Sequence, residues 1–208
     1  MARNRLTKKR LLGLDRSGPP APETLAGQPL NPWTIPNAIG FTRLALLPVF
    51  LVIALNSGDG RYAPATILYA VVGGTDYLDG MAARVLGQYS RLGTLLDPLT
   101  DRALVISGVI VCWKFDLLPR WALAVLAGRE LFMLVLTRVA MRQGLELQVK
   151  MLGRWAVWPT MFALFLAMCV DSPVSNVLLY FGLVLTLGAT FEYLQDGWRH
   201  IRGPSSSS

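Results

Sequence analysis

Residues 75–101 read T-D-Y-L-D-G-M-A-A-R-V-L-G-Q-Y-S-R-L-G-T-L-L-D-P-L-T-D, and they place four aspartates in an otherwise mostly apolar chain. Asp76 and Asp79 are three positions apart and Asp97 and Asp101 are four apart, so on helices each pair shares one face. The glycine and polar residues between the pairs predict a turn, and a helical hairpin would make the two pairs face each other. Four converging carboxylates repel unless cations lie between them. An all-oxygen ligand set favours a hard ion, Mg²⁺ or Mn²⁺.

The composition predicts a polytopic membrane protein. Of the 208 residues, 53% are hydrophobic and 16% are charged, whereas soluble domains carry about 25% charged residues. Apolar runs long enough to cross a bilayer recur along the chain, so we expect an all-α integral membrane protein, a six-transmembrane-helix bundle. The expected spans are about 38–55, 64–86, 92–115, 121–141, 152–170 and 174–194. Residues 31–202 should form one membrane domain between disordered tails at 1–30 and 203–208. Acidic groups inside such spans are costly and by default indicate a functional site.

The basic residues predict the orientation in the membrane. They concentrate in the N-terminal tail, in alternate loops and near the C-terminus, whereas the opposite loops hold only Arg61, Lys114 and Arg120. By the positive-inside rule both termini should be cytoplasmic, and the aspartate hairpin should open toward the cytoplasm from the cell membrane. The net charge of +7 therefore favours contact with anionic membrane lipids. No nucleic-acid partner is expected.

The aspartate stretch resembles the D-x-x-D-G-x-x-A-R-(x)8-G-x-x-x-D-x-x-x-D signature of the CDP-alcohol phosphatidyltransferase family. The matching residues are Asp76, Asp79, Gly80, Ala83, Arg84, Gly93, Asp97 and Asp101. So many fixed positions in so short a stretch make the signal specific. The resemblance implies transfer of a phosphatidyl group from CDP-diacylglycerol to an alcohol with release of CMP, a step of phospholipid biosynthesis. It also implies a homodimer.

The resemblance assigns roles to these residues. It makes Asp76, Asp79, Asp97 and Asp101 the ligands of two Mg²⁺ or Mn²⁺ ions, which clamp the attacking and leaving oxygens of the reaction. Asp101 is also the candidate catalytic base. The expected donor-nucleotide-binding residues are Gly80, Ala83, Arg84 and Gly93. Small residues there leave room for a flat base, and Gly93 allows a close approach of the two helices of the hairpin or of substrate. Arg84 either holds the donor phosphates or anchors the chain at the cytoplasmic face.

A second set of residues is expected to bind the acceptor or its phosphate: Asn37, Thr42, Arg43, Arg129, Arg138, Lys150 and Arg154. The first three lie in P-N-A-I-G-F-T-R-L-A-L-L-P, which resembles the first-span motif of the glycerophosphate and cardiolipin branches of the family. An unpaired arginine inside a span is costly, and snorkelling to the interface is the alternative explanation for each one. Neighbouring helix positions do not face each other, so no ion pair is predicted between Arg129 and Glu130.

Two segments bear on the acceptor. G-R-E-L at 128–131 and V-K-M-L-G-R at 149–154 resemble the glycerol-3-phosphate branch, which makes phosphatidylglycerophosphate. That branch commonly has Gly-Lys followed shortly by Thr, whereas Trp155 follows Gly153-Arg154 here. Cardiolipin synthase, with phosphatidylglycerol as acceptor, is therefore the main alternative. A divalent-cation transporter is a third hypothesis, but the sequence shows none of the repeats or interrupted helices expected of one.

Overall fold

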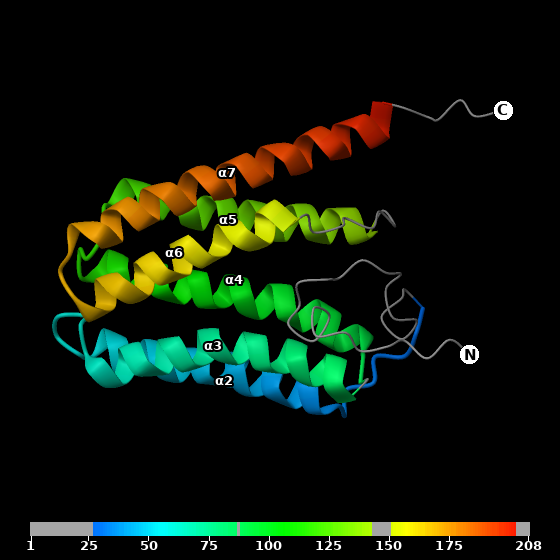
Figure 1. Cartoon of the computed structure of the whole chain (residues 1–208), viewed down its shortest axis with the longest axis horizontal. Helices are drawn as coiled ribbons and strands as arrows, with labels where there is room; N and C mark the ends of the chain where they lie inside the picture. The colour runs from blue at the N-terminus through cyan, green and yellow to red at the C-terminus, as the bar shows by residue number, and fades with distance from the viewer. Residues whose placement is uncertain (1–26, 87, 143–150, 203–208) are drawn as a thin grey trace. The chain divides into compact units, whose positions relative to one another are not determined.

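The structure is a computed structural model that describes residues 27–86, 88–142 and 151–202, and it describes their side chains except those of residues 76–85, 137–142, 151–156 and 196–202. Within these ranges all regular secondary structure is α-helical, which confirms the predicted all-α class (Figure 1). The helices are α2 (Ile35–Leu55), α3 (Ala63–Leu86), α4 (Arg91–Lys114), α5 (Arg120–Arg142), α6 (Met151–Cys169) and α7 (Pro173–Arg202). Each covers one of the expected apolar segments, and α7 continues past the expected end near residue 194.

Two of the described helices are both long enough and apolar enough to cross a bilayer. They are α2 and the Pro173–Gln195 part of α7. Shorter apolar stretches, Ala63–Thr75 and Val157–Cys169, lie in α3 and α6. α4 carries Asp97, Asp101 and Arg102 in its middle, and these charged residues lower the apolarity of any window of α4 long enough to span.

Hydroxyl side chains mark the beginnings of three helices. The Oγ atoms of Thr34, Ser90 and Ser172 accept hydrogen bonds from backbone N–H groups two or three residues later, at 3.4, 3.0 and 3.3 Å. Such caps satisfy N–H groups that the first helical turn leaves without an intrahelical partner. At α7 the cap is followed by Pro173 at the first helical position, where the missing N–H of proline costs nothing.

The chain divides into two compact units, and the boundary falls inside α2, α3 and α4. The first unit groups the described residues up to Ile53 with Ile67–Leu104. In it α2, α3 and the first half of α4 pack together. The rings of Phe50 on α2 and Tyr69 on α3 lie 5.2 Å apart between centroids. A Cβ at Gly73 of α3 would lie 3.4 Å from Leu104 Cδ2 of α4, which is ordinary van der Waals contact.

The second unit groups Ala54–Thr66 with the described residues from Val105 onward. Here α6 runs along α7, and α5 also contacts α7 (Figure 1). A Cβ at Gly182 of α7 would lie only 2.5 Å from Thr160 Cγ2 of α6, so the absence of a side chain at Gly182 permits this close approach. The rings of Trp121 and Tyr180 stack with centroids 5.4 Å apart and join α5 to α7.

Candidate functional site

The first part of the candidate site is a pair of carboxylates on α4. Asp97 and Asp101 are one helical turn apart, so they share a face of the helix as predicted. Asp97 is exposed, and the Asp101 side chain is 38% exposed. Both carboxylates are therefore open to a ligand from outside the unit.

The register of α3 against α4 places the other two aspartates at the same level. The two helices run in opposite directions (Figure 1), and Gly73 of α3 lies against Leu104 of α4. Asp76 follows Gly73 by three positions and Asp101 precedes Leu104 by three, so their backbones lie level with each other. Asp79 follows Gly73 by six positions and Asp97 precedes Leu104 by seven, so the backbones of these two residues lie within about one residue of the same level. The opposition of the two carboxylate pairs itself stays a prediction.

The donor set fits a hard divalent cation. Carboxylate oxygens are the ligands that Mg²⁺ and Mn²⁺ prefer, and the α4 pair presents them on an accessible face. The side chains of Asp76 and Asp79 lie outside those described. Among the side chains that are described, no three Asp, Glu, His or Cys residues form a group able to hold a metal ion. The four-carboxylate, two-ion site therefore stays a prediction.

Arg43 of α2 connects all three helices of the first unit. Its side chain is almost fully buried, with 1% of the residue exposed. Nε donates a hydrogen bond to the carbonyl oxygen of Val72 on α3 at 3.0 Å, and Nη2 lies 3.5 Å from Asp101 Oδ1 on α4. The sequence placed Arg43 among the acceptor-binding residues. In the structure its guanidinium contacts the candidate base itself.

A second contact joins α2 to the beginning of α4. Asn37 is buried, and its Oδ1 accepts a hydrogen bond from Ser90 Oγ at 2.8 Å. Its Nδ2 donates to the carbonyl oxygens of Asn31 and Pro32 at 3.0 and 3.3 Å. A Cβ at Gly93 would lie 2.8 Å from Asn37 Oδ1, so α2 approaches α4 closely at Gly93. The approach predicted there, between the two helices of the hairpin or with a substrate, stays a prediction. The donor-binding role of Gly93 stays a prediction.

Ser90 was not among the predicted site residues, although a signal for it exists. A serine immediately before a helical segment is a preferred N-cap, and Ser90 caps α4 through the N–H of Gly93. That signal predicts the cap alone. The second hydrogen bond, to a residue 53 positions away, has no counterpart in local sequence.

The remaining predicted residues are less fully described. Thr42 is exposed, and its hydroxyl donates to the carbonyl oxygen of Ala38 at 2.8 Å within α2. Four others lie in helices but have side chains outside those described: Gly80, Ala83 and Arg84 in α3 and Arg138 in α5. Arg154 lies in α6, and its side chain is also outside those described. Lys150 lies outside the described residues. Their roles stay predictions.

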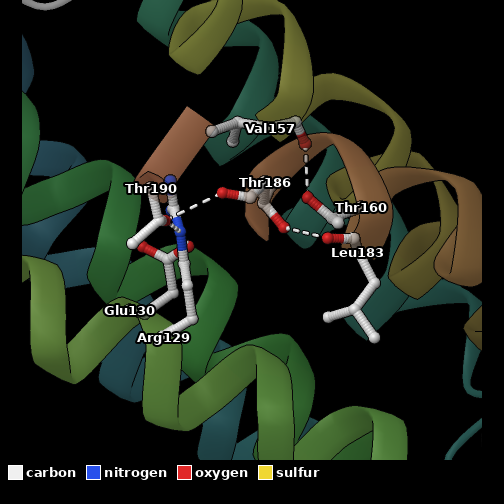
Figure 2. A network of polar contacts seen from close by, with 7 residues as sticks. All are labelled: Arg129, Glu130, Val157, Thr160, Leu183, Thr186 and Thr190. Carbon is white, nitrogen blue, oxygen red and sulfur yellow. Dashed lines mark hydrogen bonds and ion pairs between the residues drawn. The ribbon is translucent and has the colours of Figure 1, made fainter. Parts of the chain in front are cut away.

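Arg129 forms a buried ion pair in the second unit, which corrects the sequence-based reading. Its Nη1 bonds to Oε1 of Glu130, and Nε donates to Thr190 Oγ1 of α7 at 3.0 Å (Figure 2). The helical-face rule describes the directions of the Cβ atoms, whereas a guanidinium on a long, flexible stem can bend to an adjacent carboxylate. Both residues are buried, at 9% and 3% exposed, so each charge needs a partner. Thr190 in turn donates to the Thr186 carbonyl oxygen at 2.8 Å.

Replacing Arg129 with methionine is expected to destabilise the protein by about 3–5 kcal/mol, because it removes the guanidinium that pairs with the buried Glu130 carboxylate. The measurement is the unfolding midpoint of purified protein in detergent. The double variant Arg129→Met/Glu130→Leu should recover most of the loss, since it removes both charges. An unchanged midpoint for Arg129→Met, together with a raised KM for the acceptor, would instead place Arg129 in the acceptor pocket.

Comparisons with known proteins agree with the aspartate signature. Residues 33–188 match the family model described as CDP-alcohol phosphatidyltransferase. A CDP-diacylglycerol--glycerol-3-phosphate 3-phosphatidyltransferase of Bacillus subtilis is 29% identical over 189 residues, which is 82% of this chain and 98% of the relative. A cardiolipin synthase (CMP-forming) of Streptomyces coelicolor is 35% identical over 170 residues, which is 79% of this chain and 75% of the relative. A CDP-diacylglycerol--glycerol-3-phosphate 3-phosphatidyltransferase of Pseudomonas fluorescens is 28% identical over 183 residues, which is 81% of this chain and 92% of the relative.

Proposed function

The chain belongs to the CDP-alcohol phosphatidyltransferase family, and from this premise we propose that it transfers the phosphatidyl group of CDP-diacylglycerol to glycerol-3-phosphate. The products are phosphatidylglycerophosphate and CMP. The observation that most supports this function is the accessible Asp97–Asp101 pair on α4, opposite the levels of Asp76 and Asp79 on α3. These are the acidic positions of the family signature.

The reaction exchanges one phosphorus–oxygen bond for another. An acceptor hydroxyl oxygen attacks the phosphorus that bears the diacylglycerol, and the bond from that phosphorus to the CMP oxygen breaks. CMP leaves with the electron pair of that bond. The hydroxyl proton passes to the Asp101 carboxylate, which acts as general base. Its partial exposure leaves room for the acceptor hydroxyl.

The four aspartates would hold two divalent ions, Mg²⁺ or Mn²⁺. When bound, the ions supply charge neutralisation at the pyrophosphate and at the leaving oxygen. The donor nucleotide would lie along α3 and α4, against Gly80, Ala83 and Gly93, with Arg84 at its phosphates.

The acceptor phosphate would be held by basic residues on α5, α6 and the segment between them, namely Arg138, Lys150 and Arg154, together with Thr42 of α2. A phosphorylated acceptor favours such a basic pocket. Arg43, Arg129 and Asn37 were predicted for the same pocket. Their contacts with Asp101 of α4, Thr190 of α7 and Ser90 before α4 favour roles in holding helices together.

We place the enzyme in the cytoplasmic membrane as a six-span bundle with both termini in the cytoplasm and the site open to that side. The two apolar helices α2 and α7 and the family membership support a membrane location. The distribution of basic residues supports the orientation. A homodimer is the oligomeric state that the family implies.

Cardiolipin synthase, with phosphatidylglycerol as acceptor, is the second candidate. It is favoured by the 35% identity to the Streptomyces coelicolor protein. Glycerol-3-phosphate is preferred because the alignment with the Bacillus subtilis protein covers 98% of that relative and because the segments at 128–131 and 149–154 resemble that branch.

The acceptor can be identified by CMP release. Purified protein with CDP-diacylglycerol and Mn²⁺ is expected to liberate CMP when glycerol-3-phosphate is added, but not when phosphatidylglycerol replaces it. CMP release with phosphatidylglycerol alone would make the protein a cardiolipin synthase. Mn²⁺ flux into proteoliposomes without CMP release from any acceptor would contradict the transferase function.

A further inference from the structure

The first unit holds α4 against α2 at two points that flank Asp97. At one point Asn37 of α2 meets Ser90 and Gly93 of α4. At the other, Arg43 of α2 meets Asp101 of α4. Between them, a Cβ at Gly40 would lie 4.0 Å from Leu96 Cδ1, so the two helices run parallel and stay in contact over this length.

The Asn37 contact is built to resist sliding or rotation of α4. Asn37 Oδ1 accepts the Ser90 hydroxyl hydrogen, while the same Ser90 oxygen accepts the Gly93 N–H at 3.0 Å. The Asn37 amide group donates to two backbone carbonyls of the segment before α2. The buried amide of Asn37 therefore has protein partners at both its oxygen and its nitrogen.

Gly93 places this contact on the face of α4 that bears the acids. Gly93, Asp97 and Asp101 follow one another at intervals of four residues, so they lie along one face of the helix. Asn37 Oδ1 would be 2.8 Å from a Cβ at Gly93, which fixes the rotation of that face at its first turn. A shift of α4 by one residue would turn both carboxylates about 100° away from their present direction.

We propose that Asn37 and Ser90 are positioning residues that set the register and rotation of α4, and so the placing of Asp97 and Asp101 for divalent-cation binding. The role differs from the acceptor contact predicted for Asn37, because the residue is 1% exposed and its side-chain polar atoms bond to groups within the unit. The inference rests on the proposed function insofar as it takes Asp97 and Asp101 to be metal ligands.

The test compares Asn37→Ala, Ser90→Ala and the double variant with the wild type, using the purified full chain. Mn²⁺ affinity is measured directly from the electron paramagnetic resonance signal of free Mn²⁺, without turnover. Each single variant is expected to weaken Mn²⁺ binding on the order of tenfold, the lower end of what loss of a ligand-orienting partner costs. The double variant should bind about as weakly as the weaker single variant, because both changes remove the same contact. The KM for glycerol-3-phosphate should stay near that of the wild type.

Ser172→Ala is the matched control, because Ser172 caps α7 as Ser90 caps α4 but lies in the other unit. It should lower the unfolding midpoint and leave Mn²⁺ affinity unchanged. If Asn37→Ala does not fold, the Mn²⁺ affinity of Ser90→Ala alone tests the positioning role, because this variant loses a single hydroxyl and is the milder change.

The outcomes separate this role from the proposed function. Mn²⁺ affinity in the variants equal to that of the wild type would overturn the positioning role alone. A tenfold rise in the acceptor KM of Asn37→Ala at unchanged Mn²⁺ affinity would return Asn37 to the acceptor pocket. A wild-type protein that binds no Mn²⁺ would overturn the metal site itself, and this role with it.

Discussion

Asp101→Asn is expected to lower kcat by a factor of about 10²–10⁴, the range that general-base catalysis typically contributes. Asparagine has nearly the same shape, and its carbonyl oxygen can still accept a hydrogen bond from Arg43, but it cannot take a proton from the acceptor hydroxyl. Binding of CDP-diacylglycerol should remain close to that of the wild type. The measurement is CMP release at saturating substrates, together with donor binding by equilibrium titration.

The control for this prediction is Asp116→Asn. Asp116 also pairs with an arginine, Arg120, at 2.6 Å, but it lies in the turn between α4 and α5, outside the signature. It should leave kcat unchanged. If Asp101→Asn weakens donor binding as much as it lowers kcat, Asp101 acts only as a ligand of the metal or the donor, and another group is the base.

The helices were predictable because their causes are local. Long apolar runs bounded by Gly, Pro and polar turns indicate helices, and all the expected segments are helical. The expected sixth span, 174–194, matches the apolar part of α7, Pro173–Gln195, and the helix itself continues beyond that span to Arg202. A helix once formed continues into polar sequence until a breaker arrives, and here Gly203-Pro204 follows Arg202.

The site was predictable where spacing alone decides it. The interval between Asp97 and Asp101 is enough to put both on one helix face. The partners of Arg43 were not predictable, because one of them is the backbone carbonyl of Val72, and a carbonyl has no signature in sequence. The Asn37–Ser90 hydrogen bond likewise depends on how α2 docks on α4, which no local pattern specifies.

In the first unit, one pair of helices carries the acids and another helix holds them in place. The α3–α4 hairpin supplies the four acids, and α2 supplies side chains that contact α4 on either side of Asp97. A carboxylate cluster that must be both charged and accessible cannot be held by burial of its own side chains. The neighbouring helix α2 can hold the acid-bearing helix α4 instead, through the buried side chains of Asn37 and Arg43, which contact Ser90 and Asp101.

Arg43→Met is expected to reduce kcat on the order of 10–100-fold, the effect typical of losing a partner that orients a metal ligand. Loss of the guanidinium removes the contact with Asp101 and leaves the Val72 carbonyl oxygen without this donor. Stability should fall by about 1–3 kcal/mol, less than for a fully buried ion pair because Asp101 is 38% exposed. Arg43→Lys should recover little activity, because a single ammonium group lacks the planar fork that contacts a carbonyl and a carboxylate together.

Arg61→Met provides a chemically matched control for this change. Arg61 donates from Nε to the Ala167 carbonyl oxygen at 3.3 Å, and its Nη2 lies 3.5 Å from Asp171 Oδ1. Like Arg43, it therefore contacts one backbone carbonyl and one aspartate. It lies in the second unit, away from the signature, so its removal should affect the unfolding midpoint and not kcat or Mn²⁺ affinity. If Arg43→Met instead retains kcat and Mn²⁺ affinity while the KM for glycerol-3-phosphate rises, Arg43 binds the acceptor phosphate. The contact with Asp101 would then be one that the acceptor displaces.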